Sequence, residues 1–117
     1  MLNADSFSML DLSKINWRAT RHEGIHLHFL RRDDATGDAT VLIRMEPGRS
    51  YPAHRHRGIE EVFILQGGYA DSRGTHRAGD YVLNEAGSAH KPKALEDPHE
   101  DCIMLALAHG GIEILKS

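Results

Sequence analysis

A chain of 117 residues with 40% hydrophobic and 26% charged residues is long enough for one hydrophobic core and has the composition of an ordinary globular protein. Its net charge of −3 with neutral histidines lacks the surplus of Lys and Arg that a nucleic-acid-binding surface needs, so we expect no nucleic-acid partner. No apolar run approaches the ~20 residues of a membrane helix, and the N-terminus has no basic-then-apolar leader pattern. We therefore expect no membrane partner and a cytoplasmic location.

The N-terminal residues 1–16 are expected to form a segment outside the main domain. Leu10, Leu12 and Ile15 in this segment would pack along the flank of that domain or pair with another subunit. The domain itself is expected to cover residues 17–117.

Short runs of strand-forming residues, separated by turn signals, then follow one another along the chain. Glycine and proline pairs such as Pro47-Gly48 and Gly67-Gly68 stand between the runs. Short strands at this spacing predict an all-β sandwich or barrel. The expected strands cover residues 25–30, 40–46, 61–66, 69–71, 81–83, 102–108 and 112–115.

Two features of the C-terminal third have simple interpretations. Residues 91–101 contain two prolines and several acidic residues, so we expect an exposed loop there. Cys102 is the single cysteine, which excludes an internal disulfide. Its apolar neighbours predict a small buried strand residue rather than a metal ligand.

His54, His56 and Glu60 lie within seven residues and form the strongest chemical signal in the chain. Histidines at positions i and i+2 of an extended segment point to the same side. A carboxylate four residues later, after a turn at Gly58, can return to the same point. Two imidazoles and a carboxylate indicate a transition-metal site, for which His90 is the leading candidate as fourth ligand.

The carboxylate of this site has two candidates, Glu60 and its neighbour Glu61. Neighbouring residues on a strand face opposite ways, so only one of them can point inward. Imidazole ligands suit zinc, iron, nickel and copper, and a carboxylate extends the choice to manganese. We expect one divalent transition metal ion, with Fe, Zn, Mn or Ni as the candidates.

These residues resemble the two motifs of the cupin superfamily. The first motif is matched without a gap by Gly48, His54, His56, Glu60 and Gly67, and the second is recognisable in Gly79, Glu85-Ala86-Gly87 and His90. The second motif departs from the usual form, because Glu85 replaces a proline and Ala94 stands where an asparagine is common. These departures affect a turn and a loop and leave the ligand set intact.

Within the superfamily, the run His-Arg-His-Arg-Gly-Ile-Glu-Glu-Val-Phe-Ile-Leu-Gln-Gly from His54 is most similar to the cupin domain of ChrR-type anti-sigma factors. Such domains resemble, in turn, small dioxygenases that cleave carbon–carbon bonds in diketones and hydroxyacetophenones. The resemblance implies a double-stranded jelly-roll barrel, a homodimer and a small-molecule ligand inside the barrel. It also implies that the metal ligands are His54, His56, Glu60 and His90, with Glu60 favoured over Glu61 by the ChrR-like spacing. Direct sigma-factor binding is not expected, because the separate helical domain of the anti-sigma factors has no counterpart here.

The remaining polar residues carry weaker signals. His26 and His28 repeat the His-x-His spacing, but no carboxylate or glycine frame accompanies them, so we expect strand histidines without a metal. Arg44 either holds a substrate carboxylate or enolate inside the barrel, or faces solvent or pairs with Glu46. Four histidines beside turn or polar residues are expected at the surface, and these are His22, His76, His99 and His109. Four further residues are candidates for the barrel interior, and these are Tyr51, Gln66, Tyr81 and Met104.

Two classes of function remain open at this point. The first is a metal-dependent, dioxygenase-like enzyme acting on a small enolisable or phenolic substrate, since four protein ligands leave two positions of a six-coordinate ion open. The alternative is a non-catalytic zinc-binding sensor or regulatory domain similar to the ChrR cupin domain. There, four ligands would complete a tetrahedral zinc ion that contributes to folding.

Overall fold

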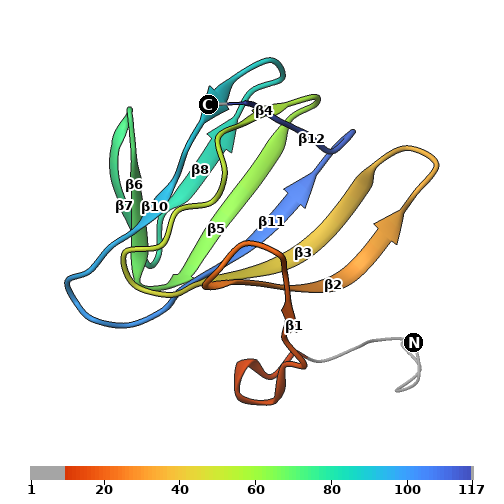
Figure 1. Ribbon diagram of the computed structural model, residues 1–117. Helices are drawn as coiled ribbons and strands as arrows, with labels where there is room; N and C mark the ends of the chain where they lie inside the picture. The colour runs from red at the N-terminus through yellow and green to blue at the C-terminus, as the bar shows by residue number, and fades with distance from the viewer. Residues whose placement is uncertain (1–9, 117) are drawn as a thin grey trace.

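The computed structural model describes residues 10–116, and strands account for nearly all of its regular secondary structure (Figure 1). In chain order, the elements are the 3₁₀ turn η2 (Leu12–Lys14) and the strands β1 (Arg18–Ala19), β2 (Ile25–Asp33), β3 (Asp38–Met45), β4 (His54–His56), β5 (Glu60–Gln66), β6 (Gly68–Asp71), β7 (Gly74–Arg77), β8 (Tyr81–Asn84), β9 (Ala89–His90), β10 (Lys93–Ala94), β11 (Cys102–Ala108) and β12 (Ile112–Ile114).

A six-stranded antiparallel sheet, in the order β1-β2-β3-β11-β5-β8, forms the larger wall of the molecule (Figure 1). Side chains alternate between its two faces with the period of two that a pleated strand imposes. On β8, for example, Val82 and Asn84 are buried whereas Tyr81 and Leu83 are exposed. The sheet therefore offers one face to the core and the other to the outside.

Two three-stranded sheets, in the orders β10-β6-β7 and β12-β4-β9, complete the barrel. The hydrophobic core joins the β10-β6-β7 sheet to the larger sheet, because Tyr69 on β6 and Ala94 on β10 pack in one cluster with Ile64 and Met104. The expectation of an all-β jelly-roll barrel is confirmed. The β12-β4-β9 sheet lies at one end of this barrel, and it carries the histidine motif.

All seven expected strands are present, and their ends differ from the expected ones by at most three residues. The expectation of an exposed loop over residues 91–101 is wrong at its start. Lys93 and Ala94 form β10, and both Pro92 and Ala94 are buried. The backbone N–H of Ala94 donates to the carbonyl of Arg49 at 2.8 Å. Backbone pairing with other segments of the same protein therefore determines the structure here, although the prolines predict a loop.

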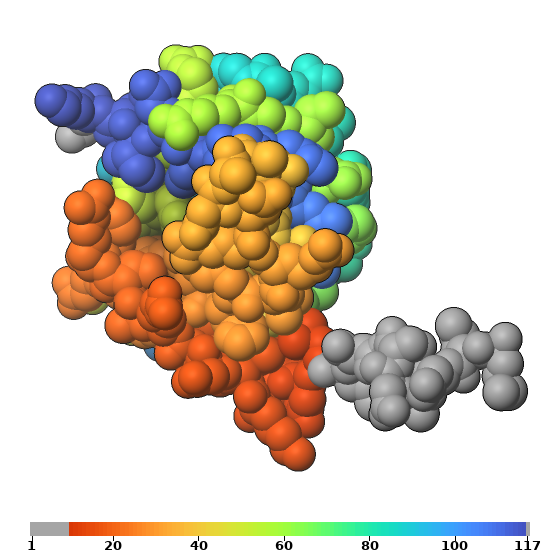
Figure 2. Space-filling view, turned by 90° about the vertical axis from the view of Figure 1, so that its right-hand side faces the viewer, coloured from red at the N-terminus to blue at the C-terminus, as the bar shows by residue number. Residues whose placement is uncertain are grey.

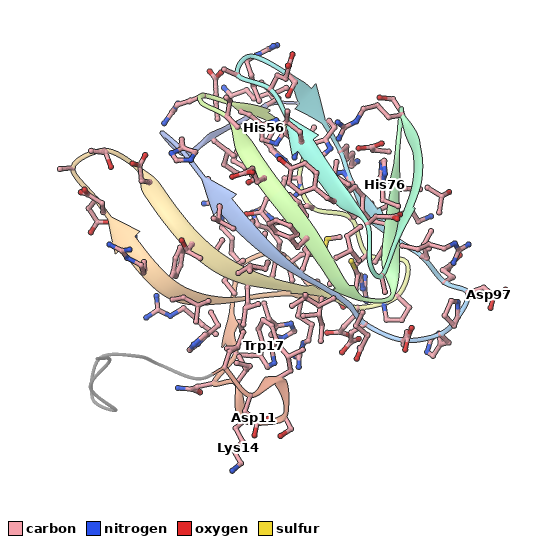
Figure 3. The ribbon with its side chains drawn as sticks, turned by 180° about the vertical axis from the view of Figure 1, so that it is seen from behind. Asp11, Lys14, Trp17, His56, His76 and Asp97 are labelled. Atoms are coloured by element: carbon pink, nitrogen blue, oxygen red, sulfur yellow. The ribbon has the colours of Figure 1, made fainter. Side chains whose placement is uncertain are left out.

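The N-terminal segment borders the barrel at β1, which pairs with β2. Before it, Leu10 and Leu12 are largely exposed, and residues 1–9 of the expected segment lie outside the described part of the chain. Figure 3 shows Trp17 under the main sheet, well away from His56. Among residues 10–116, no helix is long and apolar enough to cross a membrane.

Candidate metal centre

Three imidazole rings from two short strands meet at one end of the barrel. His54 and His56 lie on β4, and His90 lies on β9. Each ring offers one nitrogen to a group of potential ligand atoms that all lie within 4.8 Å of one another. Nε2 of His54 and Nε2 of His90 are only 3.1 Å apart. The structure thus brings together three of the four side chains expected as ligands.

Strand geometry explains why these rings converge. His54 and His56 are buried while Arg55 between them is exposed, as the period of two requires. His90 pairs directly with His54 across the β4–β9 ladder, so the two side chains share a face. Gly58 follows β4, and a Cβ at this position would collide with the carbonyl of His109. A side chain is therefore excluded at position 58, in the turn that brings Glu60 back toward the rings.

The Nδ1 atom of each ring has a hydrogen-bond acceptor outside the centre. The partners are the carbonyl of Pro52 for His54 at 2.8 Å and the carbonyl of Ser88 for His56 at 3.0 Å. For His90, the partner is a carboxylate oxygen of Asp71 at 2.9 Å. Carbonyls and carboxylates accept, so each Nδ1 carries the proton and donates, which leaves the lone pair of each neutral ring on Nε2.

The surroundings keep these rings neutral. Burial lowers the pKa of His54, and the neighbouring His90 lowers it further, against the opposing effect of the Pro52 carbonyl. The pKa of His56 falls to about 4, chiefly through burial and also through the nearby His54 and His90 rings. Burial also lowers the pKa of His90, although Asp71 opposes the shift. Neutral imidazole is the form that binds a metal ion.

The arrangement fits a bound metal ion. Three lone pairs aimed at one small region repel one another unless a cation lies between them. Nε2 of His56 is buried and has no hydrogen-bond partner among residues 10–116, which is costly for a polar atom. Coordination would satisfy this atom together with the Nε2 atoms of His54 and His90.

Glu60 lies beside this group and faces the interior. Its side chain is 14% exposed, and Oε1 lies 3.6 Å from Nε2 of His56. Asn84 donates from Nδ2 to the same Oε1 at 3.0 Å. Burial raises the pKa of Glu60, and the Asn84 hydrogen bond partly offsets that rise. Glu61 points the other way and accepts a hydrogen bond from the exposed Tyr81 hydroxyl.

A second group of polar residues, which sequence reasoning missed, supports the centre from the β6–β7 hairpin. The Asp71 side chain is fully buried, with one oxygen on His90 and the other 3.1 Å from Nε2 of His76. Arg73 donates to Asp71 at 3.1 Å and to Oδ1 of Asn84 at 2.6 Å. Burial alone would raise the pKa of Asp71, but the hydrogen bonds from His90, His76 and Arg73 outweigh it and lower that pKa.

His76 corrects one expectation. We expected it at the surface without a special role, yet its side chain is only 17% exposed and it holds Asp71. Figure 3 shows His76 on the hairpin, on the same half of the molecule as His56. The β7 strand that carries His76 was not expected either, because its residues Gly-Thr-His-Arg do not alternate between apolar and polar. The available signal for β7 was the expected strand β6, because β7 pairs with β6 and Tyr69 stands opposite His76.

A cavity of about 300 Å³ opens from the centre into the barrel, and His54, Glu60 and His90 line it. Much of its other lining is apolar, contributed by Leu27, Phe29, Val41, Ile43, Val62 and Met104. Its lining also includes exposed charged residues at the end of β2 and in the turn that follows, among them Asp33 and Asp34. Figure 2 views the molecule from the side on which the β2–β3 hairpin, in orange and yellow, stands in front.

The other candidates for the barrel interior divide between its two faces. Tyr51 and Met104 line the cavity. Tyr81 faces outward, and Gln66 donates to the carbonyl of Asp101. Arg44 does not line the cavity, because its guanidinium lies over the Trp17 ring at 5.2 Å and beside Asp101 at 3.8 Å. An inward substrate-holding role for Arg44 is thereby excluded, and Asp101 replaces Glu46 as its partner.

The remaining candidates lie away from the centre. His26 and His28 lie on β2 and belong to no metal-holding group within residues 10–116. Cys102 is buried, as expected, and burial raises the pKa of its thiol to about 12.

Comparison with known proteins agrees with this geometry. Residues 5–112 match the family model described as the ChrR cupin-like domain. The anti-sigma-E factor ChrR of Cereibacter sphaeroides is 32% identical over 97 residues, which cover 81% of this chain and 42% of ChrR. The chain therefore spans less than half the length of that relative.

Solved structures extend the comparison. The complex of Rhodobacter sphaeroides SigE with the anti-sigma ChrR matches with a TM-score of 0.70 and 29% identity, over 84% of this chain and 50% of that chain. An acetylacetone dioxygenase from Acinetobacter johnsonii matches with a TM-score of 0.78 over 100% of this chain and 82% of that chain. Its identity is 18%, so this second likeness concerns the fold.

Proposed function

The chain belongs to the ChrR cupin-like domain family, and we propose that it is a metal-binding cupin with oxygenase-like activity on a small enolisable or phenolic molecule. The proposed ligands are His54, His56, His90 and Glu60. The observation that carries the proposal is the convergence of three neutral imidazoles whose Nε2 atoms face one point.

The chemistry of this donor set favours a divalent first-row transition metal, with Fe, Zn, Mn and Ni as candidates. Such an ion, when bound, would supply a Lewis acid and, for a redox-active metal, one-electron chemistry. Hydrogen bonds from the Nδ1 atoms hold the three imidazoles, so the orientation of the rings is set before a metal ion binds. Glu60 is the negatively charged member of the proposed set, and Asn84 fixes its carboxylate.

The shape and lining of the cavity support a small, mostly apolar substrate. Apolar side chains make up much of its lining, and His54, Glu60 and His90 supply polar groups at the proposed metal centre. Tyr51 lines the same cavity, and burial, followed by the nearby Glu60, raises the pKa of its hydroxyl. A neutral Tyr51 hydroxyl can donate a hydrogen bond to a substrate oxygen.

A non-catalytic zinc-binding regulatory role is the second candidate, and a specific observation favours it. ChrR of Cereibacter sphaeroides, which is 32% identical to this chain over the matched residues, is an anti-sigma factor. In this version, three histidines and Glu60 would close a tetrahedral zinc site, and the metal would stabilise the fold. A regulatory role of this kind does not explain the apolar cavity beside the centre.

Metal analysis of protein purified without a nickel column tests the proposal and separates the two versions. Near-stoichiometric iron, manganese or nickel, followed by oxygen uptake with diketones or phenolic ketones, supports the enzyme. Zinc alone, with no small molecule able to perturb the centre, supports the regulatory domain. His54→Ala should abolish metal binding in either case and turnover in the first, and turnover that survives this substitution contradicts the proposal.

The expected homodimer also stays a prediction. We expect the dimer interface on the outer face of β5 and β8, where four large hydrophobic side chains are each between 38% and 50% exposed, namely Phe63, Leu65, Tyr81 and Leu83. Sedimentation equilibrium of the wild type and of a Leu65→Glu variant tests it, since a charge on this face should favour the monomer. The expected cytoplasmic location remains a prediction as well.

A further inference from the structure

Arg73 joins two parts of the molecule that approach the metal-facing groups from different sides. It lies in the turn between β6 and β7. Its Nη2 atom donates to Oδ2 of Asp71 at 3.1 Å and to Oδ1 of Asn84 at 2.6 Å. Its Nη1 atom donates to the carbonyl of Leu83 at 3.0 Å. One guanidinium therefore fixes the small β10-β6-β7 sheet to β8 at the edge of the main sheet.

The two partners of Arg73 each hold a proposed ligand. Asp71 accepts from Nδ1 of His90 at 2.9 Å, and Asn84 donates to Oε1 of Glu60 at 3.0 Å. A continuous path of side-chain hydrogen bonds consequently runs from His90 through Asp71, Arg73 and Asn84 to Glu60. His90 and Glu60 lie on different sheets, so the path connects ligands that the backbone does not connect directly.

Burial makes this connection important for the centre. The side chain of Asp71 is fully buried, and Asn84 is 1% exposed. A buried carboxylate requires charged or strong hydrogen-bond partners, and Arg73 is the cation that faces Asp71 beside His76 and His90. The backbone N–H of Arg73 also donates to Asp71 at 3.0 Å, so the turn itself is shaped around this carboxylate.

We propose that Arg73 is the positioning residue that sets, through Asp71 and Asn84, how His90 and Glu60 are presented to the metal ion. This inference rests on the proposed metal centre. It implies that Arg73, without contacting the metal, decides whether Glu60 joins the three histidines as a fourth ligand. The two hydrogen bonds that Nη2 makes are the physical basis of the coupling.

Lysine cannot replace Arg73 in this role. A guanidinium is planar and presents five N–H donors in a fixed fork, whereas an ammonium is a compact charge on a flexible stem. Lysine at position 73 would keep a positive charge near Asp71 but would not span Asp71, Asn84 and the Leu83 carbonyl together. The Arg73→Lys variant therefore separates the charge from the geometry.

The test uses cobalt(II) as the probe, because its visible absorption reports the number and kind of ligands. The affinity for cobalt, from competition with a chelator, and the absorption spectrum are measured for the wild type, Arg73→Lys and Arg73→Gln. Both variants should bind cobalt about 10- to 100-fold more weakly, as is usual when a residue that supports metal ligands is lost. Both should also show a changed visible spectrum. Arg77→Gln, an exposed arginine on the same hairpin, is the matched control and should behave as the wild type.

A double-mutant cycle keeps the inference testable if Arg73→Gln folds poorly. Arg73→Lys and Asn84→Ala act on one path, so their combined effect on cobalt affinity should be smaller than the sum of the single effects. Wild-type affinity and spectrum in folded Arg73→Lys, or strictly additive effects, would overturn the inference and leave the metal centre standing. A wild type that binds no cobalt would overturn the metal centre itself.

Discussion

The two halves of the candidate centre are held by different means. His54 and His56 are oriented by backbone carbonyls, those of Pro52 and Ser88, on a strand that also fixes their spacing. His90 and Glu60 are oriented by side chains, Asp71 and Asn84, which come from other strands. A backbone carbonyl is present whatever residue occupies its position, whereas a supporting side chain can be lost in one substitution. The first half is therefore robust, and the second half is open to adjustment.

This difference suggests a division of tasks. The pair on β4 would supply the basic affinity for a metal ion, since both rings are preorganised. The half built from His90 and Glu60 would tune that affinity, the coordination number and the choice of metal. Substitutions in the two halves should accordingly differ in kind as well as in size.

The largest effect is expected from His56→Ala, which removes a ring from the robust half. Metal binding should fall below detection in a chelator competition, because two imidazoles remain where three converged. Glu60→Gln, from the adjustable half, should still bind metal measurably but more weakly, and the visible absorption spectrum of its cobalt complex should change. Glu61→Gln, whose side chain faces outward, is the matched control. Equal losses for His56→Ala and Glu60→Gln would contradict the division.

An intermediate effect is expected from Asp71→Asn. The amide can still accept from His90, but it lacks the charge that Arg73 and His76 face, so the ring is less firmly held. Metal affinity should fall by about 10- to 100-fold, measured by calorimetric titration with zinc. Asp80→Asn, in the exposed turn between β7 and β8, should leave the affinity unchanged. If Asp71→Asn lost metal binding as completely as His56→Ala, the half built from His90 and Glu60 would be essential for binding, and the division of tasks would be contradicted.

The smallest effect is expected from Ser88→Ala. The hydroxyl lies 3.0 Å from Nδ1 of His56, but the backbone carbonyl of the same residue lies equally close and remains in the variant. Zinc affinity should therefore change by less than about threefold, well under the usual cost of losing a supporting group.

The buried Cys102 gives a check on the folding of all these variants. Because its thiol has a pKa of about 12, it should resist a disulfide reagent under mildly alkaline conditions until the chain unfolds.

The sequence predicted the robust half more completely than the adjustable half. The His-x-His spacing on an extended segment is a local pattern, and the strand period translates it directly into a shared face. Asp71, Arg73 and Asn84 carry no comparable pattern. Their function depends on which strands become neighbours in space, and that pairing is a property of the whole barrel rather than of any window of sequence.

The same contrast applies to the fold. The continuous apolar run of residues 102–108 was predicted as a strand with the correct bounds. The polar β7 and the two-residue β10 were not predicted, because they form only when β6 lies beside them. Arg44 shows the same limit for side chains, since its inward or outward direction depended on where Trp17 and Asp101 pack.

The pairing of His54 with His90 across β4 and β9 has a consequence for how this centre tolerates change. The two strands are three and two residues long, so strand register and metal geometry are specified by the same few backbone contacts. A slip of one residue would turn His90 to the opposite face and separate the rings. A single deletion within either strand would therefore separate the rings, whereas a substitution that preserves this pairing keeps them together. An engineer who wished to transplant the centre would move this small ladder first and rebuild the rest around it.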